Sequence, residues 1–252
     1  MAGEVARLPR RIRLRVFFRT LLLQATWNRR GMQNLGMAFA LLPAFEYLYP
    51  DEHARTSAMA RHLGFFNSHP YLGSAIVGGT LHHEERVAAG QTRPEAVDAF
   101  KQALMGPFAA VGDSFFWLSL RPFAGLFAAV LAPFIGLWAV ALFLFLYDVP
   151  HLLLRARLFS LGYRKGDRVV ESVARIGLPA LGARLRGASA FFAGGAVVVS
   201  LSLIEKEGAP PLPAAAALVL SFAGAFALFG RAGAITAGGL ALLVGLLLAF
   251  FI

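Results

Sequence analysis

Long stretches without a single charged residue constrain this sequence more than any other feature. Such stretches cover residues 122–147, 187–204, 208–230 and 232–252. Each is close to the length, about 20 residues, that a helix needs to cross the hydrocarbon core of a bilayer. A charged side chain at the bilayer centre costs roughly 3 kcal/mol, so the missing charges have a physical reason. We therefore expect an all-α integral membrane protein with several transmembrane helices.

The composition supports this class of protein and excludes others. Hydrophobic residues make up 58% of the chain and charged residues 15%, and the mean hydropathy is +0.63, too apolar for a soluble domain of this size. The chain has no cysteine, which excludes disulfides, thiolate metal sites and a cysteine nucleophile. Its net charge of +10 comes mainly from two basic blocks beside apolar segments, residues 7–30 and 155–186. Such blocks indicate the cytoplasmic face of a membrane and not a nucleic-acid site.

We divide the chain into an N-terminal helical part, residues 1–104, and a membrane part, residues 105–252. The N-terminal part is expected to be cytoplasmic or interfacial. It begins with a helix on the membrane surface, because basic and apolar residues fall on separate faces: Arg11, Arg15 and Arg19 on one, Leu14, Phe17 and Leu21 on the other. Asp51 and Glu52 predict a helix start, and that helix should end before Pro70, which places residues 67–70 on a turn.

Two apolar segments predict irregular membrane structure. Residues 71–81 are too short to span a bilayer, so they suit a re-entrant segment or a buried helix. Residues 105–117 contain Gly106, Pro107 and Gly112, which predict a broken helix of the kind that lines binding sites in transporters. Both basic blocks should face the cytoplasm. That requires either a hairpin bend at Pro133 within residues 122–147 or a contribution from the re-entrant segments.

Asp113 is the ionisable residue most deeply embedded in apolar sequence, which makes it a functional candidate. Ser114 and Trp117 follow it, and a carboxylate, a hydroxyl and an aromatic ring together suit a sugar. The structural alternative is that Asp113 caps a helix beginning at Ser114. Gly-Asp-Ser also opens a serine-esterase signature, but Ser114 lacks the Gly-x-Ser-x-Gly elbow and a recognisable His/Asp pair.

Other polar residues beside apolar segments are candidate sugar contacts, namely Gln33, Asn34, Asn67 and His69. Amide groups donate and accept hydrogen bonds, as sugar hydroxyls do. The alternative, favoured for any single one, is that they bond to loop backbone. The sequence His82-His83-Glu84-Glu85 resembles a metal cluster, but its spacing is wrong for one helix face, so we expect a solvated helix end.

Several segments resemble one family in the same order along the chain. They are FRTLLLQATWNRRGMQNLGMAFALL at 18–42, RHLGFFNSHPYL at 61–72, LMGPFAAVGDSFFWLSLRP at 104–122 and DVPHLLL at 148–154. Together they resemble the IID component of the mannose/fructose/sorbose-type phosphotransferase systems. The Asn-x-His-Pro-Tyr and Gly-Asp-Ser-x-Phe-Trp blocks are the most specific of these matches.

The resemblance implies a function that composition alone does not give. It implies a multi-pass protein of the bacterial inner membrane that forms a hexose path with a IIC membrane subunit. Soluble IIA and IIB subunits would carry the phosphoryl group, so this chain would be a transporter subunit without a cofactor, and not an enzyme. Its sugar contacts would be Gln33, Asn34, Asn67, His69, Asp113, Ser114 and Trp117. The alternative is a degenerate regulatory or scaffolding paralogue that does not move sugar.

Overall fold

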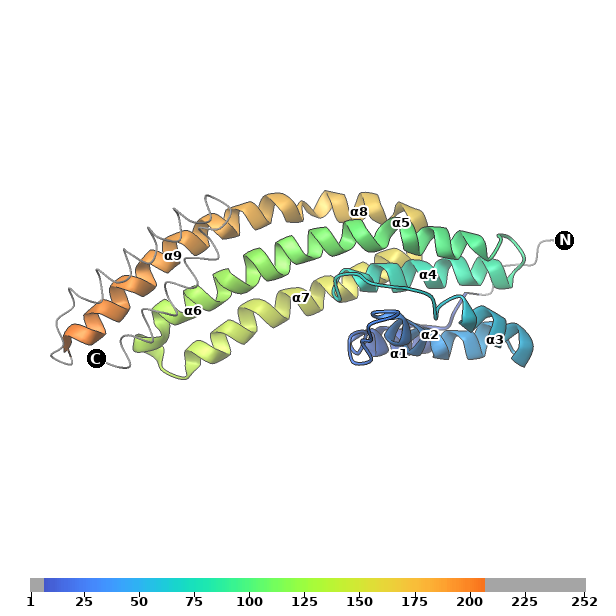
Figure 1. The fold of residues 1–252 in the computed structure, drawn as a ribbon, viewed down its shortest axis with the longest axis horizontal. Helices are drawn as coiled ribbons and strands as arrows, with labels where there is room; N and C mark the ends of the chain where they lie inside the picture. Colours follow the sequence, from blue (N-terminus) through green and yellow to red (C-terminus); the bar gives the residue numbers. More distant parts are fainter. Residues whose placement is uncertain (1–6, 207–252) are drawn as a thin grey trace. The chain divides into compact units, whose positions relative to one another are not determined.

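The computed structural model describes residues 7–206, and these residues form helices joined by loops, of which the longest are 21–33 and 61–72 (Figure 1). In the described part, only isolated β-bridges, Asn28 with Met32 and Met32 with Phe66, interrupt the all-helical pattern. The elements are α1 (Arg10–Thr20), α2 (Asn34–Leu48), α3 (Glu52–Ala60), α4 (Gly73–Ala88), α5 (Glu95–Gly112), the π-helix η1 (Asp113–Leu120), α6 (Arg121–Ile135), α7 (Trp138–Lys165), the 3-10 turn η2 (Gly166–Arg168), α8 (Val169–Ile176) and α9 (Leu178–Lys206).

The described residues fall into two compact units. One comprises residues 7–121 and 144–183, and the other comprises residues 122–143 and 184–206. Helix α5 runs through residue 104, where we divided the chain from its sequence. That division stays a prediction.

The N-terminal helices of the first unit begin and end close to the expected places. Helix α1 buries Ile12 and Val16 and exposes Phe18 on its other side. Asp51 caps α3 as predicted, because its side chain accepts a hydrogen bond from the backbone N–H of Ala54 at 2.7 Å. Helix α3 ends at Ala60, well before Pro70, and residues 67–70 are non-helical as expected.

Helix α4 is the buried centre of this unit. Its first nine residues, 73–81, are all buried, so of the two expectations for this segment the buried helix is confirmed. Glycines let its backbone meet that of α7: a Cβ on Gly78 would lie 2.2 Å from the carbonyl oxygen of Phe159, and one on Gly162 would lie 2.1 Å from that of Ala75. Small residues at helix contacts are how helices in membranes approach closely.

The helix expected to break near Pro107 is continuous. Helix α5 passes through Gly106 and Pro107 to Gly112, and the irregularity comes afterwards as η1. The prediction that the helix breaks at Gly106 and Pro107 was therefore wrong. A proline costs the helix one hydrogen bond, and the surrounding packing of α5 tolerates that loss.

The stretch 122–147 forms a helical hairpin, as one of the two topological alternatives required. The chain reverses at Gly136 and Leu137, not at Pro133, and Gly136 has the left-handed φ of 56° that glycine adopts readily. The two arms lie antiparallel, since a Cβ on Gly125 would be 4.0 Å from the ring of Phe143.

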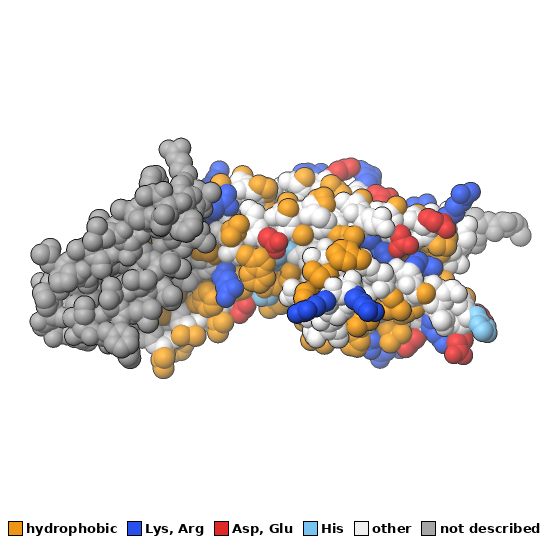
Figure 2. All heavy atoms as spheres, in the orientation of Figure 1, with side chains coloured by type: hydrophobic (Ala, Val, Ile, Leu, Met, Phe, Trp, Pro, Cys, Tyr) orange, Lys and Arg blue, Asp and Glu red, His pale blue; other side chains and the backbone are white. Residues whose placement is uncertain are grey.

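The second unit is largely apolar, with its charged residues near the two ends of α9. Phe192 of α9 packs edge-on against Phe127 of α6, with ring centroids 4.9 Å apart. Large apolar side chains remain exposed at the hairpin tip, where Leu137 is 89% and Trp138 is 76% exposed. Figure 2 shows hydrophobic side chains over much of the described surface. A lipid environment explains this exposure.

Two helical stretches in the described part, Glu95–Ile135 and Trp138–Val197, are long and apolar enough to cross a membrane, by length and composition alone. The predicted span at 187–204 lies within α9. The predicted spans at 208–230 and 232–252 lie outside the described residues.

Candidate functional site

The loop before α4 is fixed to the start of α2 by two amide side chains. Gln33 donates through Nε2 to the carbonyl oxygen of Ser68 at 2.8 Å and accepts from its N–H at 3.2 Å. Asn34 accepts from Asn28 Nδ2 at 2.9 Å and donates to the carbonyl oxygen of Leu63 at 2.6 Å. Both amides therefore bond as the structural alternative describes. They hold the loop in the position that presents the next residue, His69.

His69 lies in a tight space between the loop and the α5–η1 helix. Its ring stacks on Phe116 with centroids 5.0 Å apart and lies 5.4 Å from the ring of Trp117. A Cβ on Gly112 would lie only 2.3 Å from His69 Cβ, so glycine is needed for this approach. His69 Nδ1 accepts from the N–H of Tyr71 at 3.3 Å, which leaves the proton on Nε2. Nε2 is buried and has no partner among the described residues.

The π-helix η1 decides which of its side chains face inward. A π-helix has about one residue more per turn than an α-helix, which changes the direction of the side chains that follow. Within η1, Ser119 Oγ donates to the carbonyl oxygen of Ser114, five residues earlier, at 2.7 Å. Phe115 and Phe116 are buried as a result, while Trp117 is half-buried beside His69. π-helical turns of this kind occur often at functional sites.

A second wall comes from three residues one helical turn apart on α7: Tyr147, His151 and Arg155. The ring of His151 stacks on Tyr71 at 4.1 Å, and the hydroxyl of Tyr147 lies 3.2 Å from that of Tyr71. Arg155 is 4% exposed, and its guanidinium lies 5.8 Å from the Tyr71 ring. These residues complete what we call the histidine–aromatic cluster: His69, Tyr71, Phe116, Trp117, Tyr147, His151 and Arg155.

Arg155 is the unusual member of this cluster. It donates through Nη2 to the carbonyl oxygen of Thr20, but its Nε is buried without a partner. No carboxylate in the described part of the chain forms an ion pair with it. A buried guanidinium with an unused N–H is costly unless a ligand or partner completes it. The cluster thus offers aromatic faces beside two unpaired nitrogen atoms, on His69 and Arg155.

The remaining sequence candidates lie apart from this cluster or serve other purposes. Asp113 is exposed and forms no side-chain cap, so the capping interpretation was wrong: the helix runs through Asp113 without a start at Ser114. Ser114 is half-buried, and no histidine or aspartate among the described residues is hydrogen-bonded to its hydroxyl. Asn67 is half-buried in the loop two residues before His69.

A separate group of polar side chains joins α2, α3, α4 and α5; we call it the polar network, and it consists of Tyr49, Arg61, His62, Glu84 and Lys101. Glu84 is fully buried and accepts from Arg61 Nε and His62 Nε2, both at 2.8 Å, and from the Tyr49 hydroxyl at 2.6 Å. Lys101 Nζ lies 3.4 Å from His62 Nδ1. A lysine only donates, so His62 Nδ1 accepts the hydrogen bond from Lys101. His62 Nε2 therefore carries the ring proton and donates it in the hydrogen bond to Glu84.

Burial and hydrogen bonding set the charges in the polar network. Burial alone would raise the pKa of Glu84, but the hydrogen bonds from His62 and Arg61 outweigh it and hold that pKa at about 2. Burial lowers the pKa of His62, which agrees with a neutral imidazole. The expectation of a solvated helix end at residues 82–85 was wrong, because Glu84 and its neighbours His83 and Glu85 are buried among polar partners. The described residues contain no group that could hold a metal ion.

Comparison with known proteins gives the family. The family model described as "PTS system mannose/fructose/sorbose family IID component" matches residues 7–200. The chain belongs to this IID family.

Relatives of known name agree with this assignment. The mannose-specific EIID component of Escherichia coli K12 is 38% identical over 160 residues, which cover 63% of this chain and 56% of the relative. The fructose permease IID component of Bacillus subtilis is 33% identical over 160 residues, covering 63% and 58%. The match thus spans little more than half the length of these relatives.

Solved structures share the IID fold as well. A chain in the cryo-EM structure of the mannose transporter ManYZ with microcin E492 has a TM-score of 0.62 and 35% identity, over 76% of this chain and 70% of that chain. A second structure, described as a membrane protein, has a TM-score of 0.68 and 35% identity, over 76% and 71%. These likenesses confirm the expected all-α membrane fold.

Sequence reasoning missed five of the seven residues of the histidine–aromatic cluster in this IID chain. Those absent from the candidates were Tyr71, Phe116, Tyr147, His151 and Arg155. A signal was available for the last three, because they are spaced four residues apart and so share one face of α7. Ionisable residues that recur on one face of a membrane helix indicate that this face packs inside the protein.

Proposed function

We propose that this IID-family chain is a membrane subunit of a phosphoenolpyruvate-dependent sugar phosphotransferase permease, and that it forms the hexose path with a IIC subunit. Family membership and the likeness to a chain of the ManYZ complex support the proposal. The single observation that carries it is the histidine–aromatic cluster, with buried unpaired nitrogens on His69 and Arg155 beside aromatic rings.

The chemistry of the cluster fits a sugar. A pyranose has an apolar face that stacks on an aromatic ring, and Trp117 is the half-buried ring at this position. Its hydroxyls both donate and accept, so they can accept from His69 Nε2 and Arg155 Nε. Gln33, Asn34, Asn67, Asp113 and Ser114 remain proposed sugar-binding residues. Gln33 and Asn34 act indirectly, by holding the loop that carries His69.

In this proposal no residue of the chain is phosphorylated. Soluble IIA and IIB subunits pass the phosphoryl group to the sugar, and the chain acts as a transporter subunit, not as an enzyme. It lies in the bacterial inner membrane as a multi-pass protein, with α1 on the lipid surface. The hairpin at Gly136 supports a topology in which both basic blocks face the cytoplasm.

Co-expression with a IIC subunit tests the proposal. The two chains are extracted in mild detergent, and co-purification in fixed stoichiometry and binding of a labelled hexose are measured. Arg155→Gln should reduce hexose binding at least about tenfold, since it removes a charged donor. Arg157→Gln is the matched control, because Arg157 is exposed on the same helix.

The outcomes separate the competing functions. A complex that binds hexose through Arg155 supports the permease. A complex that binds no hexose rejects transport and supports the regulatory paralogue, and absence of any complex rejects the IIC partnership. Labelling by a serine-directed probe that Ser114→Ala abolishes would support a hydrolase instead.

A further inference from the structure

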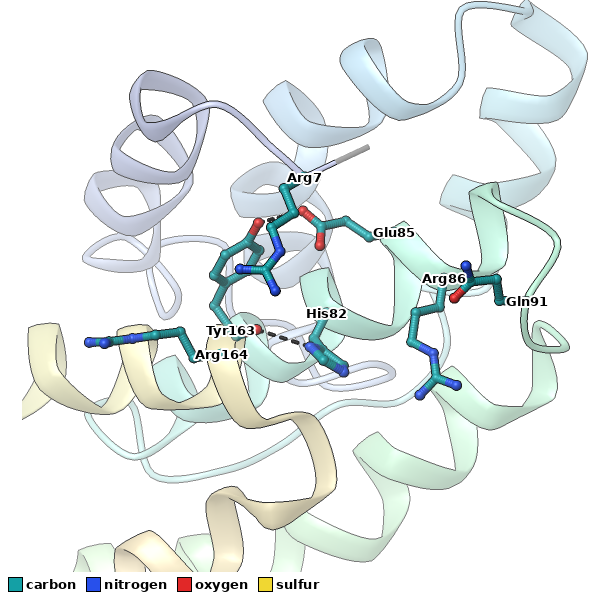
Figure 3. A pocket seen from close by; sticks show the side chains of 7 residues that line it. All are labelled: Arg7, His82, Glu85, Arg86, Gln91, Tyr163 and Arg164. Carbon is teal, nitrogen blue, oxygen red and sulfur yellow. Dashed lines mark hydrogen bonds between the residues drawn. The ribbon is translucent and has the colours of Figure 1, made fainter. Parts of the chain in front are cut away.

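The first unit contains a cavity of about 250 Å³, and none of its lining residues belongs to the histidine–aromatic cluster. It forms where the segment before α1, the end of α4 and the end of α7 meet (Figure 3). Three of its seven lining residues are arginines. The full lining is Arg7, His82, Glu85, Arg86, Gln91, Tyr163 and Arg164. We call it the arginine pocket.

The only carboxylate in this lining is already used by the fold. Glu85 is buried, and its Oε1 accepts from the N–H of Leu8 at 2.6 Å and from the hydroxyl of Tyr163 at 2.5 Å. These bonds fix the entry of the chain into α1 and the end of α7. Glu85 is therefore held at the wall by neutral donors and is not paired with an arginine.

The guanidinium groups are left with surplus charge. Arg7 and Arg86 form no ion pair with any described carboxylate, so they leave two positive groups at the pocket against one negative group. In Figure 3 the guanidinium of Arg7 lies beside the ring of Tyr163, whereas that of Arg164 points away from the other lining residues. Arg7 and Arg86 are both exposed, and the positive potential that they create at the cavity attracts an anion.

The ring of His82 is held in one orientation. Its Nδ1 lies 3.1 Å from the carbonyl oxygen of Tyr163, and a carbonyl only accepts, so Nδ1 carries a proton. Gly166 makes room for the ring: its φ is 53°, and a Cβ there would lie 2.7 Å from His82 Cδ2.

We propose that the arginine pocket binds a phosphate monoester. The planar fork of arginine matches the oxygens of a phosphate, and paired N–H donors make such contacts strong. The cavity of about 250 Å³ is of a size that suits a single phosphate group. That group belongs either to a soluble phosphate ester or to the headgroup of a phosphatidic acid lipid. Binding here does not depend on the transport function proposed above.

Calorimetric titration of the purified full chain with inorganic phosphate tests the site. The titration is run in neutral detergent above about pH 7, where phosphate carries nearly two charges, with ionic strength held constant by chloride. Saturable binding is expected, weakened at least about tenfold by Arg7→Gln or Arg86→Gln. Gly166→Ala should also weaken it by displacing His82.

Arg93→Gln is the matched control, because Arg93 is an exposed arginine outside the pocket. Absence of saturable binding, or equal loss in Arg93→Gln and Arg86→Gln, would overturn the proposal. Arg86→Lys guards against a folding defect, since it keeps the charge and loses the fork; if it binds phosphate as tightly as the parent chain, bidentate recognition is rejected.

Bilayer discs separate the two sources of the phosphate group. The titration is repeated in phosphatidylcholine discs with and without phosphatidic acid. Weaker binding of inorganic phosphate in the presence of phosphatidic acid assigns the pocket to the lipid headgroup. Equal affinity in both discs assigns it to a soluble phosphate ester.

Discussion

The polar network and the histidine–aromatic cluster lie in the same compact unit, and both bury histidine and arginine, but they differ in how completely these groups are bonded. In the polar network, His62 and Arg61 both bond to the carboxylate of Glu84, and Lys101 lies against the far side of His62. In the cluster, His69 Nε2 and Arg155 Nε have no partner among the described residues.

This difference indicates what each region does. A buried polar group with all its partners rigidifies the fold, whereas one without a partner costs free energy that the fold recovers only when something binds. The polar network therefore joins helices, and the histidine–aromatic cluster is the better candidate for a ligand. Substitutions in the first should reduce stability, and substitutions in the second should reduce binding more than stability.

Removing the carboxylate of the polar network should give the largest effect. Glu84→Gln keeps the shape but leaves the half-buried Arg61 without its counter-charge, so the cost should approach the roughly 3–5 kcal/mol of breaking a fully buried ion pair without exceeding it. Thermal unfolding in detergent, followed by loss of the monodisperse peak in size-exclusion chromatography, measures it. Glu46→Gln on the exposed side of α2 is the control. Equal melting temperatures for the two variants would show that the network does not stabilise the fold.

Two glycines on α5 test the packing of His69. Gly112→Ala drives a methyl group against His69 and should destabilise by about 1–3 kcal/mol. Gly106→Ala meets no distant residue, and the better helix propensity of alanine is opposed by the clash of its Cβ with the following Pro107, so stability should change by less than about 1 kcal/mol. The melting temperature should therefore fall further in Gly112→Ala than in Gly106→Ala. Equal falls in both variants would contradict the close approach of His69.

The stacking role of Trp117 gives a smaller effect, on binding alone. Trp117→Ala should weaken hexose binding about tenfold through lost stacking, with little change in the melting temperature. Leu118→Ala is the control on the same π-helix, since Leu118 is 61% exposed. Labelled-hexose binding to the complex with IIC measures both variants. Unchanged affinity in Trp117→Ala would mean that the ring only packs against His69.

The pH dependence of stability is the most subtle test. His62 has a lowered pKa in the folded chain, so its contribution is complete above pH 6.5, the ordinary pKa, and decreases as pH falls below that value. Glu84 contributes fully above its ordinary pKa of 4.5, and its contribution is lost as pH falls toward about 2.

The melting temperature should therefore fall in two steps as the solution is acidified. His62→Asn should reduce the first step, to which His83, whose pKa is also lowered by burial, contributes as well. His53→Gln, an exposed control on α3, should retain the step in full. An unchanged first step in His62→Asn would show that His62 does not titrate on unfolding.

Several features of the fold were predictable because they depend on local chemistry or on hydropathy. The charge-free stretch at 122–147 predicted membrane helices, and Asp51 predicted the start of α3. The candidate site was predictable in part. His69 and Trp117 do meet, but Asp113, the strongest candidate by sequence, is exposed. A run of apolar neighbours shows that a residue is near the membrane and does not show which way it faces.

The sequence by itself determined the class of protein, the family and the helices, because charge-free length and family motifs are properties of the chain in one dimension. Only the tertiary structure decided that Gly106 and Pro107 do not break α5, that η1 turns Phe116 inward, and that residues 82–85 are buried. The physical reason is that direction and burial depend on helical phase and on neighbours distant in sequence. Arg155 meets Tyr71 and Thr20 across the bundle, and no local pattern encodes those contacts.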